Sequence, residues 1–308
     1  GLVDREAIAR AGLHLIVDPM YGSGRGLLAR FLGEYCRVET IHDHRDPLFG
    51  GMMPDPQEAN LAELRARVIC APNALGLATD GDADRFGIVD DDGTYLTPNQ
   101  VIALLLFHLV RNRGWKGVVA RTVATTHLID RIAAAYGLAT IETPVGFKYI
   151  GEAMRTKPVV IGGEESGGLS IRGHIPEKDG ILACALAAEM RAVTGRSLIA
   201  TLAELYREYG GAYTKRLDLH LPQEEKERLI RSFLEDPPAR VLGHEVVEVR
   251  RIDGLKCLLA SGAWFLLRPS GTEALVRAYV EAPSVAERDA LVAWLEEAIA
   301  ARRSKAAS

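Results

Sequence analysis

The sequence has few cysteines, no long apolar run and almost no excess of either charge. Its cysteines are Cys36, Cys70, Cys184 and Cys257. They are scattered and form no C-x-x-C pair, which excludes a disulfide framework and is typical of a reducing compartment. The net charge of -4 argues against a nucleic-acid partner, since such domains are usually basic. The longest apolar run, Val101–Val110, contains His108 and is too short to span a bilayer. We therefore expect a cytoplasmic protein with no nucleic-acid or membrane partner.

What the sequence does have is the composition of a globular protein. Hydrophobic residues make up 48% and charged residues 25% of the 308 residues, so a core is possible throughout. Up to about residue 193, short apolar strands alternate with helices, which predicts two α/β units with parallel sheets. The strands expected there are 13–18, 38–41, 75–79, 86–89, 117–121, 139–142 and 159–162. The expected helices are 4–11, 27–35, 60–67, 99–111, 126–136, 149–155 and 179–193.

The sequence pattern changes at about Tyr213. From there on, strands with alternating polar and apolar residues, together with two helices, predict an α+β region with an antiparallel sheet. The strands expected in this region are 214–220, 246–251, 256–260, 264–267 and 275–281. The expected helices are 224–234 and 285–301.

An acidic loop, residues 80–85, carries three carboxylates at alternate positions between an apolar segment and a strand. It reads Asp-Gly-Asp-Ala-Asp-Arg. Alternate carboxylates in an extended turn can aim their oxygens at one hard cation such as Mg²⁺ or Ca²⁺. An EF-hand is excluded because its sixth and twelfth positions fall on Arg85 and Asp91. The alternative is a solvated acidic turn, although three close carboxylates repel each other unless a cation neutralises them.

A second loop, the Glu-Ser loop at residues 163–168, follows the expected strand 159–162. It reads Gly-Glu-Glu-Ser-Gly-Gly. Glycines allow the backbone to approach a ligand closely, and Glu and Ser side chains can bond to adjacent sugar hydroxyls. The loop is not the G-x-S-x-G elbow of hydrolases, because Glu164 stands where the first glycine would be. The alternative is a glycine-rich surface turn.

A third loop, the arginine loop at residues 268–273, follows the expected strand 264–267. It reads Arg-Pro-Ser-Gly-Thr-Glu. Arginine binds phosphate through paired N–H groups, and hydroxyls with consecutive backbone N–H groups can form an anion-binding nest. The alternative is a tight turn with an exposed arginine.

Two other stretches give weaker signals. The glycines at 22–26 are similar to a dinucleotide fingerprint, but Leu27 stands in place of the final glycine, which favours a strand-to-helix turn. Nucleotide binding at these glycines is the less favoured reading. The stretch His42-Asp43-His44 is better explained by a solvated loop than by a metal site.

The three loops, in this order, resemble one family, the α-D-phosphohexomutases (phosphoglucomutase and phosphomannomutase). The family's magnesium loop reads D-G-D-x-D-R, its sugar loop G-E-x-S-G and its phosphate loop R-x-S-G-T-E. These patterns are matched by residues 80–85, 163–167 and 268–273. Residues 18–22 and 146–148 also resemble the start of the family's second domain and a lysine loop in its third. The resemblance covers essentially the whole chain.

The resemblance implies a domain organisation. Of the family's four domains, the chain resembles the second to the fourth. These would be two consecutive α/β/α three-layer domains at 1–113 and 114–209, then a smaller α+β domain with an antiparallel sheet at 210–308. The family's first domain carries T-x-S-H-N-P, whose serine is phosphorylated, and no S-H-N-P occurs in these 308 residues. We therefore expect the isolated chain to be inactive or nearly so without a phosphoserine domain.

The resemblance also implies a reaction and residue roles. The family moves a phosphoryl group reversibly between C1 and C6 of a hexose phosphate. Glucose 1-phosphate becomes glucose 6-phosphate through glucose 1,6-bisphosphate. The implied Mg²⁺ ligands are Asp80, Asp82 and Asp84, and the implied catalytic residues are Arg85 and Lys148. The implied substrate-binding residues are Glu164, Ser166, His174, Lys178, Arg268, Ser270, Gly271 and Thr272.

The preferred substrate is less sharply indicated than the family. Glu165 and the stretch 174–180 look most like phosphoglucomutases, and a phosphomannomutase or dual-specificity mutase is the alternative. A hypothesis from a different class is a non-catalytic sugar-phosphate-binding protein that keeps the loops without the chemistry.

Overall fold

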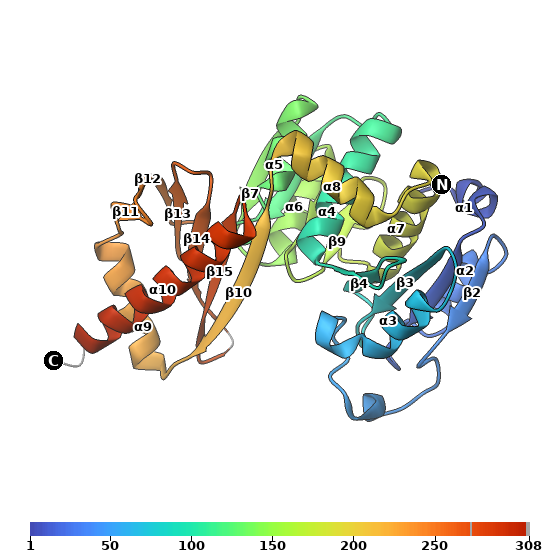
Figure 1. Cartoon of the computed structure of the whole chain (residues 1–308), viewed down its shortest axis with the longest axis horizontal. Helices are drawn as coiled ribbons and strands as arrows, with labels where there is room; N and C mark the ends of the chain where they lie inside the picture. The colour runs from blue at the N-terminus through green and yellow to red at the C-terminus, as the bar shows by residue number, and fades with distance from the viewer. Residues whose placement is uncertain (272, 306–308) are drawn as a thin grey trace. The chain divides into compact units, whose positions relative to one another are not determined.

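The computed structural model describes residues 1–271 and 273–305, and the chain forms two compact units (Figure 1). The first unit comprises Gly1–Thr125, Ile129–Glu142 and Gly146–Leu205. The second comprises Thr126–Leu128, Thr143–Val145 and Tyr206–Ser308. Among the described residues, every helix is too short or too polar to cross a membrane.

The first unit contains a mixed five-stranded sheet in the order β2-β1-β3-β4-β5. Its strands are β1 (His14–Asp18), β2 (Arg37–Thr40), β3 (Ala74–Thr79), β4 (Phe86–Val89) and β5 (Tyr95–Leu96). β1 pairs in parallel with β2 and β3, whereas β4 and β5 are antiparallel additions. β1 and β3 are buried at every position, which explains their continuous apolar sequences. Because β1 and β3 are parallel, the segments that follow them leave the sheet at the same edge.

A second sheet in the same unit has the order β7-β6-β8-β9. Its strands are β6 (Val118–Thr122), β7 (Ala139–Thr143), β8 (Val159–Gly163) and β9 (Leu169–Ile171). β6 and β8 are parallel, and β9 returns antiparallel to β8. The loop after β8 is therefore the turn of a hairpin.

Helices and short helical turns complete the first unit. They are α1 (Arg5–Ala11), α2 (Leu27–Leu32), η1 (Phe49–Gly51), η2 (Glu58–Asn60), α3 (Ala62–Ile69), α4 (Pro98–Phe107), η3 (His108–Asn112), α5 (Leu128–Ala135), α6 (Phe147–Thr156), α7 (Gly180–Thr194) and α8 (Leu198–Tyr209). α3 packs on β1 and β3 through Leu64 and Val68, and α6 packs on β6 and β8. α7 contacts β3 and β4 of the first sheet and β9 of the second. α8 lies outside the helices expected from the sequence, and its last four residues, 206–209, belong to the second unit.

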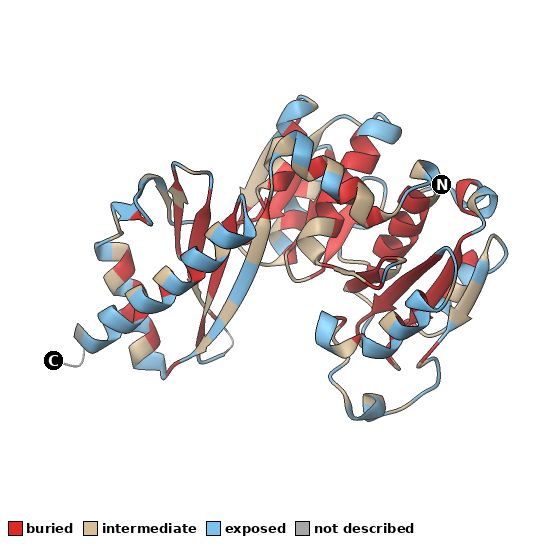
Figure 2. Ribbon diagram, in the orientation of Figure 1, coloured by how far each residue is buried: buried red, intermediate tan, exposed pale blue. Residues whose placement is uncertain are grey.

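The helices α4 and α7 are buried almost all round, and Figure 2 shows them largely in red. A helix that is apolar on every face belongs in a core, which accounts for the unbroken apolar run of α4. The α-helix expected at 99–111 ends at Phe107 and continues as a π-helical turn, η3. Burial would raise the pKa of Glu189 on α7, but hydrogen bonds from His108, Arg113 and the Asp4 N–H lower it to about 2.

The second unit contains an antiparallel six-stranded sheet in the order β10-β15-β14-β13-β12-β11. Its elements are β10 (Tyr213–His220), α9 (Gln223–Glu235), β11 (Arg240–Val241), β12 (His244–Arg250), β13 (Leu255–Leu259), β14 (Trp264–Pro269), β15 (Leu275–Ala282) and α10 (Val285–Lys305). Apolar side chains of α9 and α10, such as Phe233 and Leu295, join one core with Val276, Ala278 and Val280 of β15. Alternate residues of β15 therefore face these helices.

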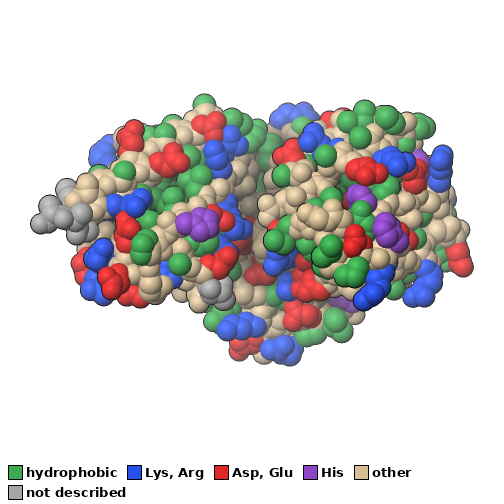
Figure 3. All heavy atoms as spheres, turned by 90° about the horizontal axis from the view of Figure 1, so that it is seen from below, with side chains coloured by type: hydrophobic (Ala, Val, Ile, Leu, Met, Phe, Trp, Pro, Cys, Tyr) green, Lys and Arg blue, Asp and Glu red, His purple; other side chains and the backbone are tan. Residues whose placement is uncertain are grey.

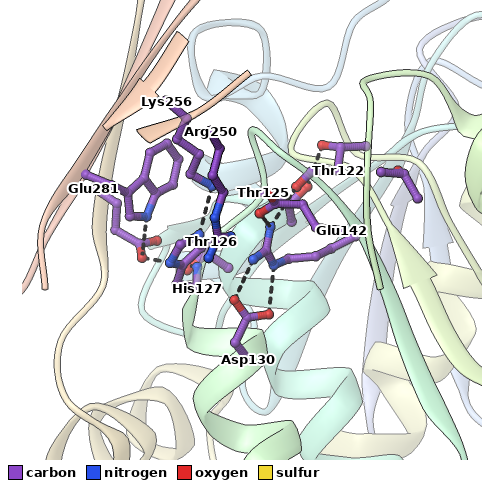
Figure 4. Close-up of polar contacts among 12 residues, drawn as sticks. Thr122, Thr125, Thr126, His127, Asp130, Glu142, Arg250, Lys256 and Glu281 are labelled. Carbon is purple, nitrogen blue, oxygen red and sulfur yellow. Dashed lines mark hydrogen bonds and ion pairs between the residues drawn. The ribbon is translucent and has the colours of Figure 1, made fainter. Parts of the chain in front are cut away.

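Other side chains of β13, β14 and β15 pack against the short segment Thr126–Leu128 (Figure 4). Lys256, which is almost fully buried, donates to His127 Nε2 at 2.8 Å and lies over the ring of Trp264. The Glu281 Oε1 atom accepts hydrogen bonds from the His127 N–H and from Trp264 Nε1, both at 3.1 Å. These contacts explain why the helix expected at 126–136 begins only at Leu128.

The surface carries charges of both signs. On the face drawn in Figure 3, Lys and Arg side chains alternate with Asp and Glu side chains. This mixture matches the near balance of 37 basic and 41 acidic residues in the sequence.

Candidate active-site loops

The acidic loop leaves the carboxyl end of β3 and is closed by its own hydrogen bonds. The Asp80 carboxylate accepts from the Arg85 N–H at 2.9 Å, and the Ala83 N–H donates to the Asp80 carbonyl at 3.1 Å. Ala83 adopts a left-handed φ of 65°, which turns the chain between the carboxylates. The glycine at position 22 is needed beside it, because a Cβ there would lie 2.7 Å from the carbonyl oxygens of Asp80 and Gly81.

The loop brings the three predicted metal ligands together. One oxygen from each of Asp80, Asp82 and Asp84 lies within 4.8 Å of the other two. Burial, opposed by the Arg85 N–H and reinforced by the charges of Asp84 and Asp82, raises the pKa of Asp80 to about 6. Oxygen ligands of one Mg²⁺ ion, each at about 2.0–2.1 Å from it, lie roughly 3–4 Å apart. The hard, negatively charged oxygens of this loop therefore fit a divalent cation.

Lys178 joins the acidic loop to the start of α7. Its Nζ lies 2.5 Å from Asp84 Oδ2. Burial would lower the pKa of Lys178, but the hydrogen bond and charge of Asp84 raise it overall. The next turn of the chain is held in place as well, because the Gly180 N–H donates to the Ala83 carbonyl at 3.0 Å and Asp179 caps α7. Arg85 lies less closely, with its Nε 3.8 Å from Asp80 and 3.9 Å from Asp84.

The Glu-Ser loop forms the turn between β8 and β9. The Glu164 N–H donates to the Gly168 carbonyl at 2.9 Å, and the Gly167 N–H donates to the Glu164 carbonyl at 3.1 Å. Gly167 has a φ of 101°, a conformation that residues with a Cβ rarely adopt. The side chain of Glu164 is thereby directed inward, where its Oε1 accepts from the Gly146 N–H at 3.0 Å.

Glu164 is a buried carboxyl whose pKa lies near neutral pH. The residue is only 5% exposed, and this burial, helped by the charge of Glu165, raises its pKa to about 7. The Gly146 N–H and the charges of Lys178 and Arg85 oppose that rise. Carboxyls with such perturbed pKa values are concentrated at functional sites.

The acidic loop and the Glu-Ser loop face each other within the first unit. A Cβ on Gly167 would contact the Arg85 side chain at 3.5 Å, and one on Gly168 would lie 2.6 Å from the Lys178 side chain. The same Cβ on Gly168 would lie 3.4 Å from Glu164 Oε2, so Lys178 lies between Asp84, which it contacts, and Glu164, whose pKa its charge lowers. The structure thus brings together residues from two loops that are about eighty positions apart in the sequence.

The remaining predicted residues of this unit are Ser166, Lys148 and His174, and each has different surroundings. Ser166 is half-buried in the Glu-Ser loop. Lys148 is exposed on the first turn of α6, with its Nζ 4.9 Å from the Tyr149 ring centre. His174 pairs with Asp179 at 2.9 Å and lines a cavity of about 1050 Å³ whose walls include Gly1–Glu6, Trp115 and Glu189. Neither Asp84, Glu164 nor Lys178 lines this cavity.

The arginine loop belongs to the second unit and follows β14. The Ser270 N–H donates to the Leu275 carbonyl at 2.9 Å, and the Ser270 hydroxyl accepts from the Glu273 N–H at 3.2 Å. Beneath the loop, Lys226 of α9 is buried and donates to the carbonyl of Ser270 at 3.0 Å. Gly271 is exposed with open space around it, and Thr272 lies outside the described residues.

Two residues of this loop's surroundings escaped prediction from the sequence. Lys226 supports the carbonyls of the turn, and Asp253 accepts from Arg268 Nε at 2.6 Å. Asp253 stands in an Asp-Gly pair before an apolar strand, which is a turn signal but not a binding signal. Lys226 lies among other charged residues of α9, and no sequence motif distinguishes it from them.

Three family descriptions match the chain. They are phosphoglucomutase/phosphomannomutase alpha/beta/alpha domain II over residues 2–93, alpha/beta/alpha domain III over 97–209, and the C-terminal domain over 229–298. Their order along the chain follows the three sheets described above, although β5 and β10 lie outside the matched ranges.

Similar proteins carry several mutase names. A "Phosphoglucomutase/phosphomannomutase" of Thermococcus kodakarensis is 31% identical over 92% of this chain and 59% of its own length. A "Phosphoglucosamine/phosphogalactosamine mutase" of Sulfurisphaera tokodaii is 30% identical over 91% of this chain and 60% of its own length. A crystal structure of a candidate phosphomannomutase from Thermus thermophilus is 33% identical, with a TM-score of 0.82 over 96% of this chain and 63% of that one. The chain thus spans about 60% of the length of these two relatives.

Proposed function

Because the chain belongs to the phosphoglucomutase/phosphomannomutase family, we propose that it forms the metal-, sugar- and phosphate-binding part of a phosphohexomutase. The proposed reaction is reversible transfer of a phosphoryl group between the C1 and C6 oxygens of a hexose phosphate, through a bisphosphate sugar. The observation that carries the proposal is the position of Lys178, between Asp84 of the acidic loop and Glu164 of the Glu-Ser loop. A cation shared by a metal loop and a hydroxyl-binding carboxyl suits a site for a sugar phosphate.

The acidic loop supplies the proposed metal site, with Asp80, Asp82 and Asp84 as Mg²⁺ ligands. Bound there, Mg²⁺ would supply positive charge beside the transferring phosphoryl group. Phosphoryl transfer depends mainly on positioning and charge neutralisation, and Arg85 adds a second cation at this edge of the loop. Lys178 pairs with Asp84 at the same edge of the loop.

The sugar would be held by the Glu-Ser loop and its neighbours. With a pKa of about 7, Glu164 can accept a hydrogen bond from a hydroxyl when ionised and donate one when neutral. Ser166 adds a hydroxyl in the same turn. We propose His174 and Lys178 as further sugar-site residues, and Lys148 as the residue that carries a proton or pairs with the substrate charge.

The arginine loop would hold the phosphate that is not transferred. Arg268 supplies a guanidinium that can pair with phosphate oxygens, and we propose that Ser270 and the exposed Gly271 complete the phosphate site. Thr272 stays a predicted member of this group. Such a grip would serve either orientation of the bisphosphate sugar, as a reversible mutase requires.

The domain organisation is proposed on the same basis. Domains at 1–113, 114–209 and 210–308 each contain one of the three sheets. The phosphoryl donor would be a phosphoserine on a further domain, supplied in the same polypeptide or in trans. We expect the chain of 308 residues alone to turn over hexose phosphates very slowly.

The activity test uses glucose 1-phosphate, a trace of glucose 1,6-bisphosphate and Mg²⁺, with glucose 6-phosphate as the measured product. A phosphoserine domain from a relative is added in trans in one arm. Turnover comparable to that of intact mutases without this domain would contradict the proposed need for it. The same assay with mannose and amino-sugar 1-phosphates measures the substrate preference. Relatives with different mutase names are 30–31% identical to this chain, so sequence identity does not distinguish between their substrates.

The binding test is calorimetric titration of the chain with glucose 6-phosphate. We expect binding that is lost in Arg268→Ala. The control variant is Arg228→Ala, which removes an exposed arginine of the same unit and should retain binding. Unchanged affinity in Arg268→Ala would contradict the assignment of the arginine loop.

A further inference from the structure

One carboxylate oxygen in the second unit joins three separate parts of the chain. The Oδ2 atom of Asp253 accepts from Arg268 Nε at 2.6 Å and from the Val145 N–H at 3.0 Å. Asp253 stands in the turn between β12 and β13, Arg268 near the end of β14, and Val145 in the short segment that packs with this unit. The side chains of Arg268 and Asp253 are 15% and 22% exposed, so their contact is largely shielded from water.

The backbone forces this approach. Gly254 has a φ of 95°, and a Cβ there would lie 2.2 Å from the Leu267 carbonyl oxygen and 3.0 Å from the Arg268 Cα. Only glycine allows the turn to press so closely on β14. The side chain of the preceding residue, Asp253, is therefore brought beside the guanidinium.

The pairing also resolves a conflict between like charges. Arg268 and Arg277 are directly opposite each other in the register of β14 and β15. Like charges at opposed positions of a sheet repel each other. Each guanidinium has its own carboxylate, Asp253 for Arg268 and Glu273 for Arg277, the latter at 2.5 Å. Asp253 thus offsets the repulsion between the charges of Arg268 and Arg277.

The atom that Asp253 binds decides what Arg268 can still do. A guanidinium has five N–H groups, and a phosphate is best gripped by a pair of them. Among the described residues, Arg268 donates through Nε, which leaves the four N–H groups on its two terminal nitrogens for another acceptor. A carboxylate that bridged those terminal nitrogens would compete with a phosphate, whereas one held at Nε orients the group.

We propose that Asp253 is a positioning residue that holds Arg268 by its Nε edge and presents the terminal nitrogens to the substrate phosphate. This role rests on the proposed function, because it assumes that Arg268 binds that phosphate. Asp253 acts through Arg268 and does not touch the substrate itself.

The first arm of the test needs no ligand. The Nε–H resonance of Arg268 and the amide resonance of Val145 are followed by NMR in the wild-type chain, Asp253→Ala and Asp253→Asn. We expect both protons to be protected from exchange in the wild type and in Asp253→Asn, whose amide oxygen can accept the same bonds. Both should lose protection in Asp253→Ala. Unaltered protection of Arg268 in Asp253→Ala would overturn the proposal.

The second arm measures the affinity of the same variants for glucose 6-phosphate. We expect Asp253→Ala to bind about tenfold more weakly, as for loss of one charge-assisted hydrogen bond, and Asp253→Asn to stay within about threefold of wild type. Asp218→Ala is the matched control, since Asp218 pairs with Arg216 on the same sheet. This control should leave affinity unchanged.

The outcomes separate the two proposals. A wild-type chain that fails to bind the sugar phosphate would overturn the proposed function and with it the phosphate role of Asp253. Normal wild-type binding with equal or tighter binding in Asp253→Ala would overturn the positioning role alone. A loss in Asp253→Ala that Asp253→Asn restores would support it.

Discussion

Replacing Glu164 by glutamine is expected to stabilise the folded chain at alkaline pH and to have little effect in acid. Burial is the main cause that raises the pKa of Glu164 from an ordinary value of 4.5 to about 7, and the charge of Glu165 adds to it. Glutamine keeps the oxygen that accepts from the Gly146 N–H but has no carboxyl to ionise. The variant should therefore escape a loss of stability that the wild type undergoes as pH rises.

The sign and size of that loss follow from linkage. A carboxyl whose pKa is raised by folding contributes stability that is fully present below pH 4.5, the unfolded value, and is lost as pH rises through 7. Each unit of pKa difference corresponds to about 1.4 kcal/mol. Between pH 5 and pH 8, the wild type should therefore lose about 2–3 kcal/mol of unfolding free energy relative to Glu164→Gln.

The assay is urea denaturation followed by far-UV circular dichroism at several pH values from 5 to 8. Glu34→Gln, which removes an exposed carboxylate of the same unit, is the matched control. Its unfolding free energy should follow the pH dependence of the wild type. Parallel pH profiles for the wild type and Glu164→Gln would refute the reasoning, because they would mean that folding does not perturb this carboxyl.

Three further predictions concern the metal loop, the turn beside Arg268 and a buried ion network. Mg²⁺ at pH 8 is expected to raise the melting temperature of the wild type in a thermal scan, and Asp82→Ala should abolish that rise because one ligand is lost. Gly254→Ala is expected to lower the unfolding free energy in urea by at least about 2 kcal/mol through its backbone clash. Gly262→Ala, with a similar φ and open space, should cost only about 1 kcal/mol, so equal losses would rule out the clash. Arg121→Ala should lower the unfolding free energy in urea by about 3–5 kcal/mol, because the carboxylates of Asp130 and Glu142 lose the buried guanidinium that pairs with both. A decrease of less than about 1 kcal/mol would contradict this expectation.

The sequence predicted the family and the fold class, and both predictions are confirmed. The reason is that each signal is local. The carboxylates of the acidic loop follow one another at alternate positions, and the antiparallel region after Tyr213 shows a period of two in its own strands. The three candidate loops could be singled out in the same way, since each is a contiguous stretch at the end of an apolar strand.

Boundaries and helices without a local signature were harder to predict. The helix expected at 126–136 begins at Leu128, because His127 is held by Lys256 and Glu281, which are more than a hundred positions away. The α-helix expected at 99–111 gives way to a π-helical turn at His108, where Glu189 of another helix accepts a hydrogen bond. Both outcomes depend on partners that local periodicity does not register.

By itself, then, the sequence predicted which short stretches carry the proposed chemistry and which elements precede them. Only the tertiary structure decided that Lys178 lies between Asp84 and Glu164, and that Asp253 holds Arg268 by one edge. It also decided that His174 lines a cavity beside the N-terminal residues. The physical reason is that a motif is fixed by neighbours along the chain, whereas an ion pair and a raised pKa are fixed by neighbours in space, which packing alone assembles.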